Sequence, residues 1–411
     1  MFTARTIGAN EPTEGARLQS ALPHRLPEKK RRVLLLSEII APYRIPVFNA
    51  LAENERIDLH VAFLAETDSA LRKWHVYKNE IRFSYEVLPS WRLRSGRHKL
   101  LLNWGLRSCL KKFVPETIVC GGYNYLASWE ALAWTRRHQA ELVLWSESNR
   151  YDARRGLAWV EALKSCFLAG CARFVVPGKS SREYLQLLGS APKDIVTAPN
   201  AIDNVWFRSQ AAATRDRSSE FRAKFQLPSC YLLFVGRLVP EKGIFDLLRA
   251  YAKLECPVRS RVGLVFAGDG PSLSKLERQA RSINPGMICF PGFAHREDIA
   301  GFYALAEALI LPTRSDPWGL VVNEGMACGL PVIVSSVAGC AADLVEDGWN
   351  GFVVPPGDCE KLSIALARLL RAADLRQQMS LRSLDRIRNY SPEACAQGLA
   401  AAAIPGARQA G

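Results

Sequence analysis

Short apolar runs alternate with longer helical patterns along most of the chain. In the first half the apolar runs have the length and composition of buried strands, and IPVFNALAEN at 45–54 is the helix expected after the first of them. The strand candidates are VLLLSEI at 33–39, IDLHVAF at 57–63, TIVCGG at 117–122, ELVLWSES at 141–148 and ARFVVPG at 172–178. Strands that alternate with helices in this way are typical of parallel βαβ construction.

A second series of the same kind occupies the other half of the chain. Its strand candidates are YLLFVGR at 231–237, LVFAGDG at 264–270, ICFPGF at 288–293, ALILPT at 308–313 and PVIVSS at 331–336. The stretch 207–228 between the two series is polar and charged, which favours a linker. A chain of 411 residues also exceeds the usual size of one hydrophobic core. The pattern therefore predicts an α/β fold of two Rossmann-like, doubly wound domains that face a cleft.

Composition indicates an ordinary soluble protein, with 48% hydrophobic and 23% charged residues. The longest apolar stretch, 166–178, is interrupted by Arg173 and is shorter than the roughly 20 residues that span a bilayer. Residues 1–30 contain no apolar segment of the kind that a secretory signal needs. We expect a disordered arm there and a cytoplasmic protein.

Cysteine and histidine spacing gives no sign of a metal or disulfide framework. None of the 11 cysteines forms a C-x-x-C pair, and the closest two, Cys166 and Cys171, are separated by four residues. The six histidines show no H-E-x-x-H spacing. We expect free thiols in a reducing compartment and no metal site built by the protein.

Positive charge is concentrated in the first half of the chain. Residues 1–200 carry 30 Lys and Arg against 19 Asp and Glu, whereas residues 201–411 carry 24 against 21. The densest stretch, 91–113, has a basic amphipathic pattern. Its basic residues are Arg92, Arg94, Arg97, Lys99, Arg107, Lys111 and Lys112. Three interpretations stay open: contact with an anionic membrane surface, a nucleic-acid groove, or a helix that packs on the sheet with a solvated basic face.

Ligands of open parallel sheets bind beyond the carboxyl ends of the strands, so the loops after the predicted strands are the candidate sites. In VGRLVPEKG, Arg237 ends a strand and Lys242 precedes a helix. A diphosphate there would meet a guanidinium, an ammonium group and the free N–H groups of a helix N-terminus. In AGDGP, Gly268 and Gly270 permit close backbone approach, but Leu273 replaces the third glycine of a dinucleotide fingerprint.

The loop LPTRSDPWGLVVNEGMACGLPVIVSS places two carboxylates at the mouth of the second sheet. Asp316 leaves a strand, Gly319 shapes a tight turn, and Glu324 lies on the short helix that follows. Either carboxylate could accept two hydrogen bonds from a vicinal diol such as that of ribose. An isolated acid at a helix start is more often a cap. The neighbouring Arg237 and Lys242 loop favours ligand binding.

Five segments together carry a family resemblance over residues 231–358, namely VGRLVPEKG, LVFAGDGP, ICFPGF, DPWGLVVNEGMACGLPVI and DGWNGFVVPPGD. In this order and spacing they resemble glycosyltransferase family 4, whose members are retaining, nucleotide-sugar-dependent enzymes of the GT-B fold. The segment NYSPEACAQGLAAA resembles the terminal helix that crosses back to the first domain in this fold.

The resemblance implies roles for individual residues. Arg237 and Lys242 would neutralise the donor diphosphate in place of a metal, so that no cofactor is needed beyond the UDP- or GDP-sugar itself. Glu324 would hold the ribose, and Asp316, one methylene shorter than the family's glutamate, would touch the transferred sugar. The remaining donor-side residues would be Gly268, Gly319, Leu320 and Phe293, the last near the base.

The first half departs from the family pattern, so Arg44 in SEIIAPYR and Glu147 in LWSESNR are only candidate acceptor-side groups. The implied function is retaining transfer of a sugar to an acceptor hydroxyl, on a lipid-linked or cell-surface polysaccharide intermediate. We expect a cytoplasmic protein that contacts the inner face of the cell membrane and binds no nucleic acid. The alternatives are a nucleotide-sugar epimerase or hydrolase of the same fold and a nonenzymatic basic binding protein.

The expected organisation follows from the pattern and the resemblance together. It comprises a disordered arm at 1–30, an acceptor-binding domain at 31–207, a linker region at 208–228, a nucleotide-sugar-binding domain at 229–388, and a crossover helix and tail at 389–411.

Overall fold

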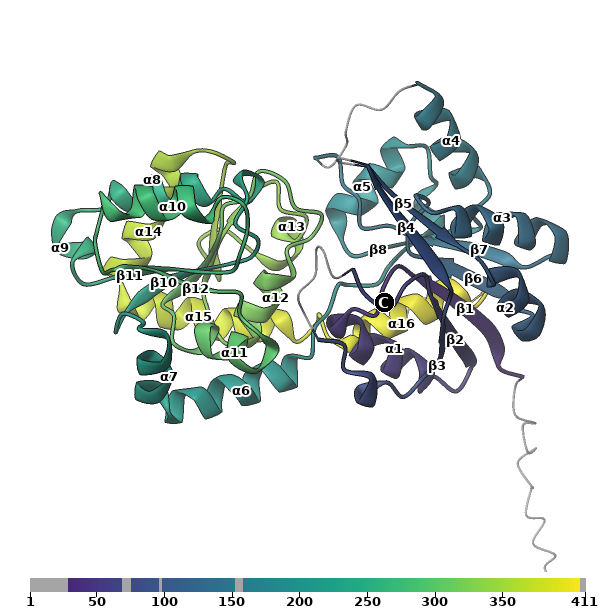
Figure 1. The fold of residues 1–411 in the computed structure, drawn as a ribbon, viewed down its shortest axis with the longest axis horizontal. Helices are drawn as coiled ribbons and strands as arrows, with labels where there is room; N and C mark the ends of the chain where they lie inside the picture. The colour runs from purple at the N-terminus through teal and green to yellow at the C-terminus, as the bar shows by residue number, and fades with distance from the viewer. Residues whose placement is uncertain (1–28, 69–74, 96–97, 152–157, 407–411) are drawn as a thin grey trace, which may run out of the picture.

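The computed structural model describes residues 29–68, 75–95, 98–151 and 158–406, which form two parallel β-sheets flanked by helices (Figure 1). Apart from its last two residues, the predicted arm at 1–30 lies outside the described residues. Among the helices of the described ranges, none combines the length and apolar character needed to cross a membrane.

The first sheet has the strand order β3-β2-β1-β6-β7-β8-β9. Its strands are β1 (Arg31–Ser37), β2 (Ile57–Phe63), β3 (Ser84–Val87), β6 (Thr117–Cys120), β7 (Glu141–Trp145), β8 (Arg173–Val176) and β9 (Ile195–Thr197). Its helices are α1 (Ile45–Ala52), α2 (Leu106–Phe113), α3 (Leu126–His138), α4 (Ala158–Ala169) and α5 (Lys179–Leu187). Leu34 and Leu35 point into different apolar cores on opposite faces of the sheet. Burial on both faces explains why the strands appear in the sequence as continuous apolar runs.

The second sheet has the order β12-β11-β10-β13-β14-β15. Its strands are β10 (Tyr231–Val235), β11 (Gly263–Ala267), β12 (Ile288–Gly292), β13 (Ala308–Leu311), β14 (Val332–Ser335) and β15 (Gly351–Val354). Its helices are α8 (Ile244–Ala252), α9 (Cys256–Arg259), α10 (Leu273–Arg281), α11 (Arg296–Ala304), α12 (Leu320–Ala327), α13 (Ala341–Leu344), α14 (Cys359–Arg371) and α15 (Ala373–Ile387).

Each sheet has a point at which the strand order reverses. β1 lies between β2 and β6, and β10 lies between β11 and β13. Successive connections leave such a point in opposite directions, which opens a crevice beyond the carboxyl ends of the two central strands. The topology therefore positions the candidate site at the ends of β1 and β10.

The basic stretch 91–113 is not one amphipathic segment. Its first part is an antiparallel hairpin of β4 (Ser90–Ser95) and β5 (His98–Asn103), and only α2 is helical. Gly105 lies between the hairpin and α2. Its φ of 93° is in the left-handed region, which glycine adopts more readily than other residues. The interpretation as a sheet-packing helix with a basic face holds for α2 alone, where Leu110 is buried and Lys111 is exposed.

The polar stretch 208–228, predicted as a linker, lies largely within α6 (Asn204–Asp216) and α7 (Ser218–Phe225). Asp203 caps α6 by accepting a hydrogen bond from the Trp206 N–H at 2.9 Å. Phe207 is buried in the core of the second half, and Arg215 donates to the Ala304 and Cys328 carbonyls. This stretch is therefore packed onto the second half.

The terminal helix α16 (Pro392–Ala403) lies against α1 in the first half (Figure 1). Cys395 and Leu399 are buried in the core that contains β1. Thr117 Oγ1 donates to the Ala403 carbonyl at 2.9 Å, and Arg173 Nε donates to the Ala402 carbonyl at 2.6 Å. The C-terminal helix therefore forms part of the hydrophobic core of the first half.

Candidate active site

A cleft lies between the two halves, and both contribute to its lining. A cavity of about 430 Å³ is lined by residues that follow β1, β6 and β7 and by Pro317 from the second half. A second cavity, of about 270 Å³, is lined by Tyr43 and Tyr77 on one side and by Trp206 and Glu324 on the other. Arg296 closes its edge by pairing with Glu80, at 2.7 Å and 2.8 Å from the two carboxylate oxygens.

Arg237 and Lys242 both lie in the loop that follows β10. Arg237 is exposed and lines a cavity of about 270 Å³ together with Gly268 and Phe293. Lys242 ends the short turn Pro240–Lys242, and its Nζ lies 2.5 Å from Asp316 Oδ2. The loop thus presents one cation to open space and holds the other against a carboxylate.

Gly268 follows β11 at a place where only glycine fits. A Cβ at this position would lie 1.9 Å from the Gly236 carbonyl oxygen, and φ is +155°. The loops after β10 and β11 can therefore approach each other closely beside Arg237. The cavity they form adjoins the cavity that contains Glu324, since Val235 and Phe293 line both.

Asp316 is buried, with 8% of its surface exposed, and its loop is tied to the first half. Asn149 Nδ2 donates to the Asp316 carbonyl at 3.3 Å and to the Pro317 carbonyl at 3.4 Å. Asn149 is itself fully buried and follows β7 by four residues. Sequence reasoning selected its neighbour Glu147 and missed Asn149, whose only signal was its place after a strand.

Helix α12 begins at a glycine turn and carries the second carboxylate. Gly319 precedes it at φ 98°, and a Cβ there would lie 2.7 Å from Leu311 Cδ2. Leu320 is the first helical residue, and the N–H groups of Leu320 and Val321 precede the first backbone hydrogen bond of the helix, which runs from the Val322 N–H to the Gly319 carbonyl at 2.9 Å. The positive end of the helix dipole thus lies next to Asp316.

Glu324 has an unusual environment for a carboxylate. Tyr303 donates its hydroxyl to Glu324 Oε2 at 2.6 Å. Burial raises the pKa of Glu324 to about 7, and the Tyr303 hydrogen bond partly opposes that rise. Sequence reasoning did not identify Tyr303, which reaches Glu324 from α11.

Arg44 and Glu147, the two acceptor-side candidates, form an ion pair that lines the larger cavity. The Arg44 guanidinium also lies 3.9 Å from the centre of the Trp145 ring. Burial alone would lower the pKa of Arg44, but the Glu147 carboxylate and other neighbours raise it overall. The Arg44 guanidinium is therefore positively charged, and Pro317 of the second half lines the same cavity as the pair.

No residue of these cavities belongs to a potential metal cluster. In the part of the chain that the structure describes, three or more metal-ligating side chains come together only at His60, Glu86 and Cys109, which line none of the cavities above.

Comparison with known proteins identifies the second half most clearly. Residues 217–384 match the family described as Glycosyl transferases group 1. The alpha-D-kanosaminyltransferase of Streptomyces kanamyceticus is 34% identical over 172 residues, which cover 41% of this chain and 44% of that protein. The O-antigen chain mannosyltransferase B of Escherichia coli is 31% identical over 53% of this chain and 56% of that protein. The chain thus matches about half the length of these relatives.

Most of the chain, including both halves, has a counterpart among solved structures. Anabaena Alr3699/HepE, in complex with UDP and glucose, superposes with a TM-score of 0.70 over 90% of this chain and 98% of that one, at 17% identity. This likeness concerns the fold, which is GT-B: two Rossmann-like domains that face a cleft. The family resemblance is confirmed at the level of the group 1 glycosyl transferases, which residues 217–384 match.

Proposed function

We propose that the protein is a glycosyltransferase that moves a sugar from a nucleoside-diphosphate sugar to an acceptor hydroxyl. The observation that carries this proposal is the meeting of Lys242, Asp316 and the N-terminus of α12 at one end of the cleft. The cation and the free backbone N–H groups can bind a diphosphate, and the carboxylate can accept hydrogen bonds from the hydroxyls of an attached sugar. The group 1 family match over this same segment supports the assignment.

The donor fits along the adjoining cavities of the second half. In this proposal the diphosphate contacts Arg237, Lys242 and the first-turn amides of α12, and Glu324 accepts hydrogen bonds from the ribose hydroxyls. Phe293, which is 36% exposed, offers an apolar surface for the base. The relative whose structure contains UDP and glucose makes UDP-glucose the first donor to test.

The chemical step then depends on charge stabilisation. As the bond from the sugar to the diphosphate breaks, negative charge grows on the departing oxygen beside Lys242 and Arg237, and positive charge grows on the sugar beside Asp316. Retention, which the family resemblance implies, requires the acceptor oxygen to attack from the face that the diphosphate leaves. The acceptor proton would then pass to the departing phosphate oxygen, whose basicity rises as it gains charge.

A thermal-shift panel with UDP, GDP and their sugars tests donor binding, because a ligand that binds the folded state raises the melting temperature. The same donors are then incubated with and without glycan acceptors. Rapid turnover of donor alone would instead favour the epimerase or hydrolase alternative. No stabilisation by any nucleotide, together with salt-sensitive nucleic-acid binding, would favour a nonenzymatic basic protein.

We further propose a lipid-linked or cell-surface polysaccharide intermediate as the acceptor, at the inner face of the membrane. Trp91, Trp104 and Leu126 are 57%, 56% and 58% exposed, which is unusual for large apolar side chains. Leu126 is adjacent to Tyr125, which lines the acceptor-side cavity, and Lys111 adds exposed positive charge. Aromatic and basic side chains together are typical of membrane interfaces.

Vesicle flotation tests this location. The protein should bind anionic vesicles at low salt, and high salt should weaken the binding. Replacing Trp91 and Trp104 with Ala should abolish it, whereas Leu381→Ala, which removes an equally exposed side chain from α15, should not. A wild-type protein that ignores anionic vesicles at low salt would rule the location out while leaving the transferase proposal intact.

A further inference from the structure

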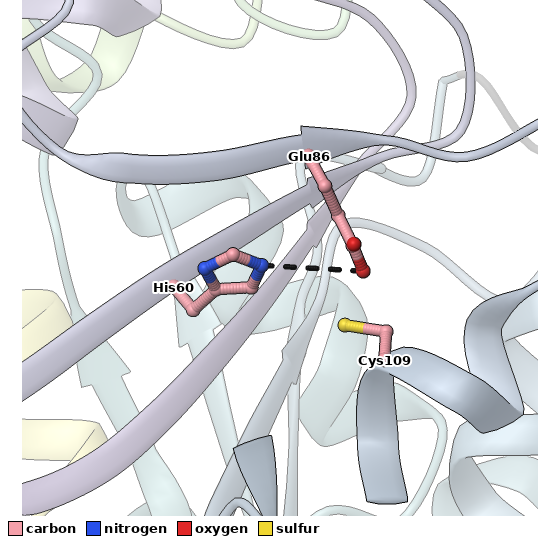
Figure 2. Close-up of side chains that lie close together, drawn as sticks. All are labelled: His60, Glu86 and Cys109. Atoms are coloured by element: carbon pink, nitrogen blue, oxygen red, sulfur yellow. Dashed lines mark ion pairs between the residues drawn. The ribbon is translucent and has the colours of Figure 1, made fainter. Parts of the chain in front are cut away.

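We propose that His60, Glu86 and Cys109 bind a divalent metal ion of the zinc class at a site outside the cleft (Figure 2). His60 lies on β2, Glu86 on the edge strand β3 and Cys109 on α2. The three residues belong to different elements, so their spacing in the sequence gave no metal-binding signature.

The separations of the three donor atoms suit a small ion. One nitrogen, one carboxylate oxygen and the sulfur all lie within 4.8 Å of one another, and His60 Nε2 lies 4.0 Å from Glu86 Oε1. Tetrahedral zinc holds nitrogen or oxygen at about 2.0–2.2 Å and sulfur at about 2.3 Å, which places neighbouring donors roughly 3.5 Å apart. Movements of about 1 Å or less, within reach of small side-chain rotations, would complete the geometry.

The imidazole of His60 is oriented for ligation. Its Nδ1 lies 2.8 Å from Ser84 Oγ, and the ring packs against Phe113 with 5.3 Å between ring centres. Nε2 consequently faces Glu86, and Figure 2 shows both side chains turned toward the Cys109 sulfur. A histidine whose second nitrogen is held by a polar neighbour is the usual arrangement at metal sites.

The described residues use only part of the acceptor capacity of Glu86, because the Cys109 side chain hydrogen-bonds its carboxylate. Its Oε1 is buried and has no hydrogen-bond partner there, since His60 Nε2 at 4.0 Å is too distant. Cys109 beside it is 5% exposed. A buried carboxylate oxygen without a partner costs free energy, which a bound cation would offset.

The donor set selects the class of metal. A thiolate, an imidazole and a carboxylate suit zinc, whereas magnesium and calcium prefer oxygen ligands alone. Three protein ligands leave a fourth position for water. Because His60 is in the middle of β2 and the cleft lies beyond the strand ends, the ion would tie the edge strand β3 to β2 and α2.

Metal titration of the full chain tests the site. After removal of metal by chelation, the wild-type protein should bind one equivalent of Zn²⁺, and saturation should raise its melting temperature by several degrees. Co²⁺ in place of Zn²⁺ should give the visible bands of a tetrahedral site and a thiolate-to-cobalt charge-transfer band. Cys109→Ser should abolish that charge-transfer band. Cys120→Ser, which removes another buried thiol of the same domain, should retain it.

Two further variants keep the test independent of Cys109→Ser folding. His60→Gln and Glu86→Gln retain the thiol, and each should lower Zn²⁺ affinity by at least about tenfold. Absence of stoichiometric binding by the wild type, or unchanged affinity in both variants, would overturn the proposal. Neither measurement uses transferase activity, so the outcome is independent of the proposed function.

Discussion

Lys242 Nζ lies 2.5 Å from Asp316 Oδ2, so the cation expected to bind the diphosphate is paired with the carboxylate expected to bind the sugar. The two residues come from the loops after β10 and β13, which are adjacent strands. A bound donor would lie against both residues, with its phosphates next to Lys242 and its sugar next to Asp316.

Asp316→Asn should separate donor binding from catalysis. Removing the carboxylate charge also removes its repulsion of the diphosphate, so affinity for the nucleoside diphosphate alone should stay equal or rise. The transfer rate should fall because the sugar gains positive charge in the transition state. Calorimetry with the nucleoside diphosphate and initial rates with the full donor measure the two effects. A fall in nucleotide affinity as large as that of Glu324→Gln would contradict this division of roles.

Glu324→Gln should weaken the nucleotide itself. A hydrogen bond to a charged acceptor contributes about 1.5 to 3 kcal/mol, so affinity for both the nucleoside diphosphate and the sugar donor should fall about ten- to a hundredfold. Below pH 7 the wild type should also lose affinity, because its carboxyl, with a pKa of about 7, must release a proton to accept two hydroxyls. The variant should retain only the pH dependence of the phosphates. Identical pH profiles for the two proteins would exclude Glu324 as the titrating group.

The free energy of unfolding should change with pH in the opposite direction to nucleotide affinity: it should fall as the pH rises and Glu324 loses its proton. Its pKa is about 7 in the folded protein against an ordinary value of 4.5, so between these values the folded state holds a proton that the unfolded state has released. Binding of this proton by the folded state adds to the free energy of unfolding. The added stability is fully present below pH 4.5 and is lost as the pH rises through 7. Above pH 7, Glu324→Gln should be more stable than wild type by up to about 2 to 3 kcal/mol. Denaturant unfolding at pH 5 and pH 8 measures this difference, which should be larger at pH 8.

Arg237 should matter for the leaving group and not for folding. It is exposed, so Arg237→Ala should leave the melting temperature nearly unchanged while lowering kcat by about 100- to 1000-fold. Arg237→Lys should recover little of this loss, because an ammonium cannot replace a bidentate guanidinium. A wild-type rate from Arg237→Ala would remove this residue from the site.

Divalent ions should not be needed for transfer if Arg237 and Lys242 neutralise the diphosphate. Protein and substrates freed of Mg²⁺ and Mn²⁺ on a chelating resin, with Zn²⁺ restored to the protein, should be as active as the same mixture with these ions added. Activity that requires Mg²⁺ or Mn²⁺ would contradict the assignment.

Local patterns determined much of the fold and most of the donor-side candidates. Leu232, Leu233 and Phe234 are fully buried, and such continuous apolar runs identified most parallel strands of both halves, although the short strands β3, β9 and β15 were not predicted. Because ligand sites of parallel sheets follow strand ends, the same runs drew attention to Arg237 and Asp316. The structure places both residues at the cleft, and their catalytic roles stay predictions.

Tertiary structure alone decided how distant segments meet. Asn149 reaches the Asp316 carbonyl across 167 residues of chain, and Tyr303 reaches Glu324 from a neighbouring helix. The hairpin of β4 and β5 replaced an expected amphipathic segment because pairing between strands depends on partners that a helical pattern does not show. His60, Glu86 and Cys109 come together for the same reason: sheet order and helix packing set which side chains become neighbours, and neither is encoded in the spacing of any one motif.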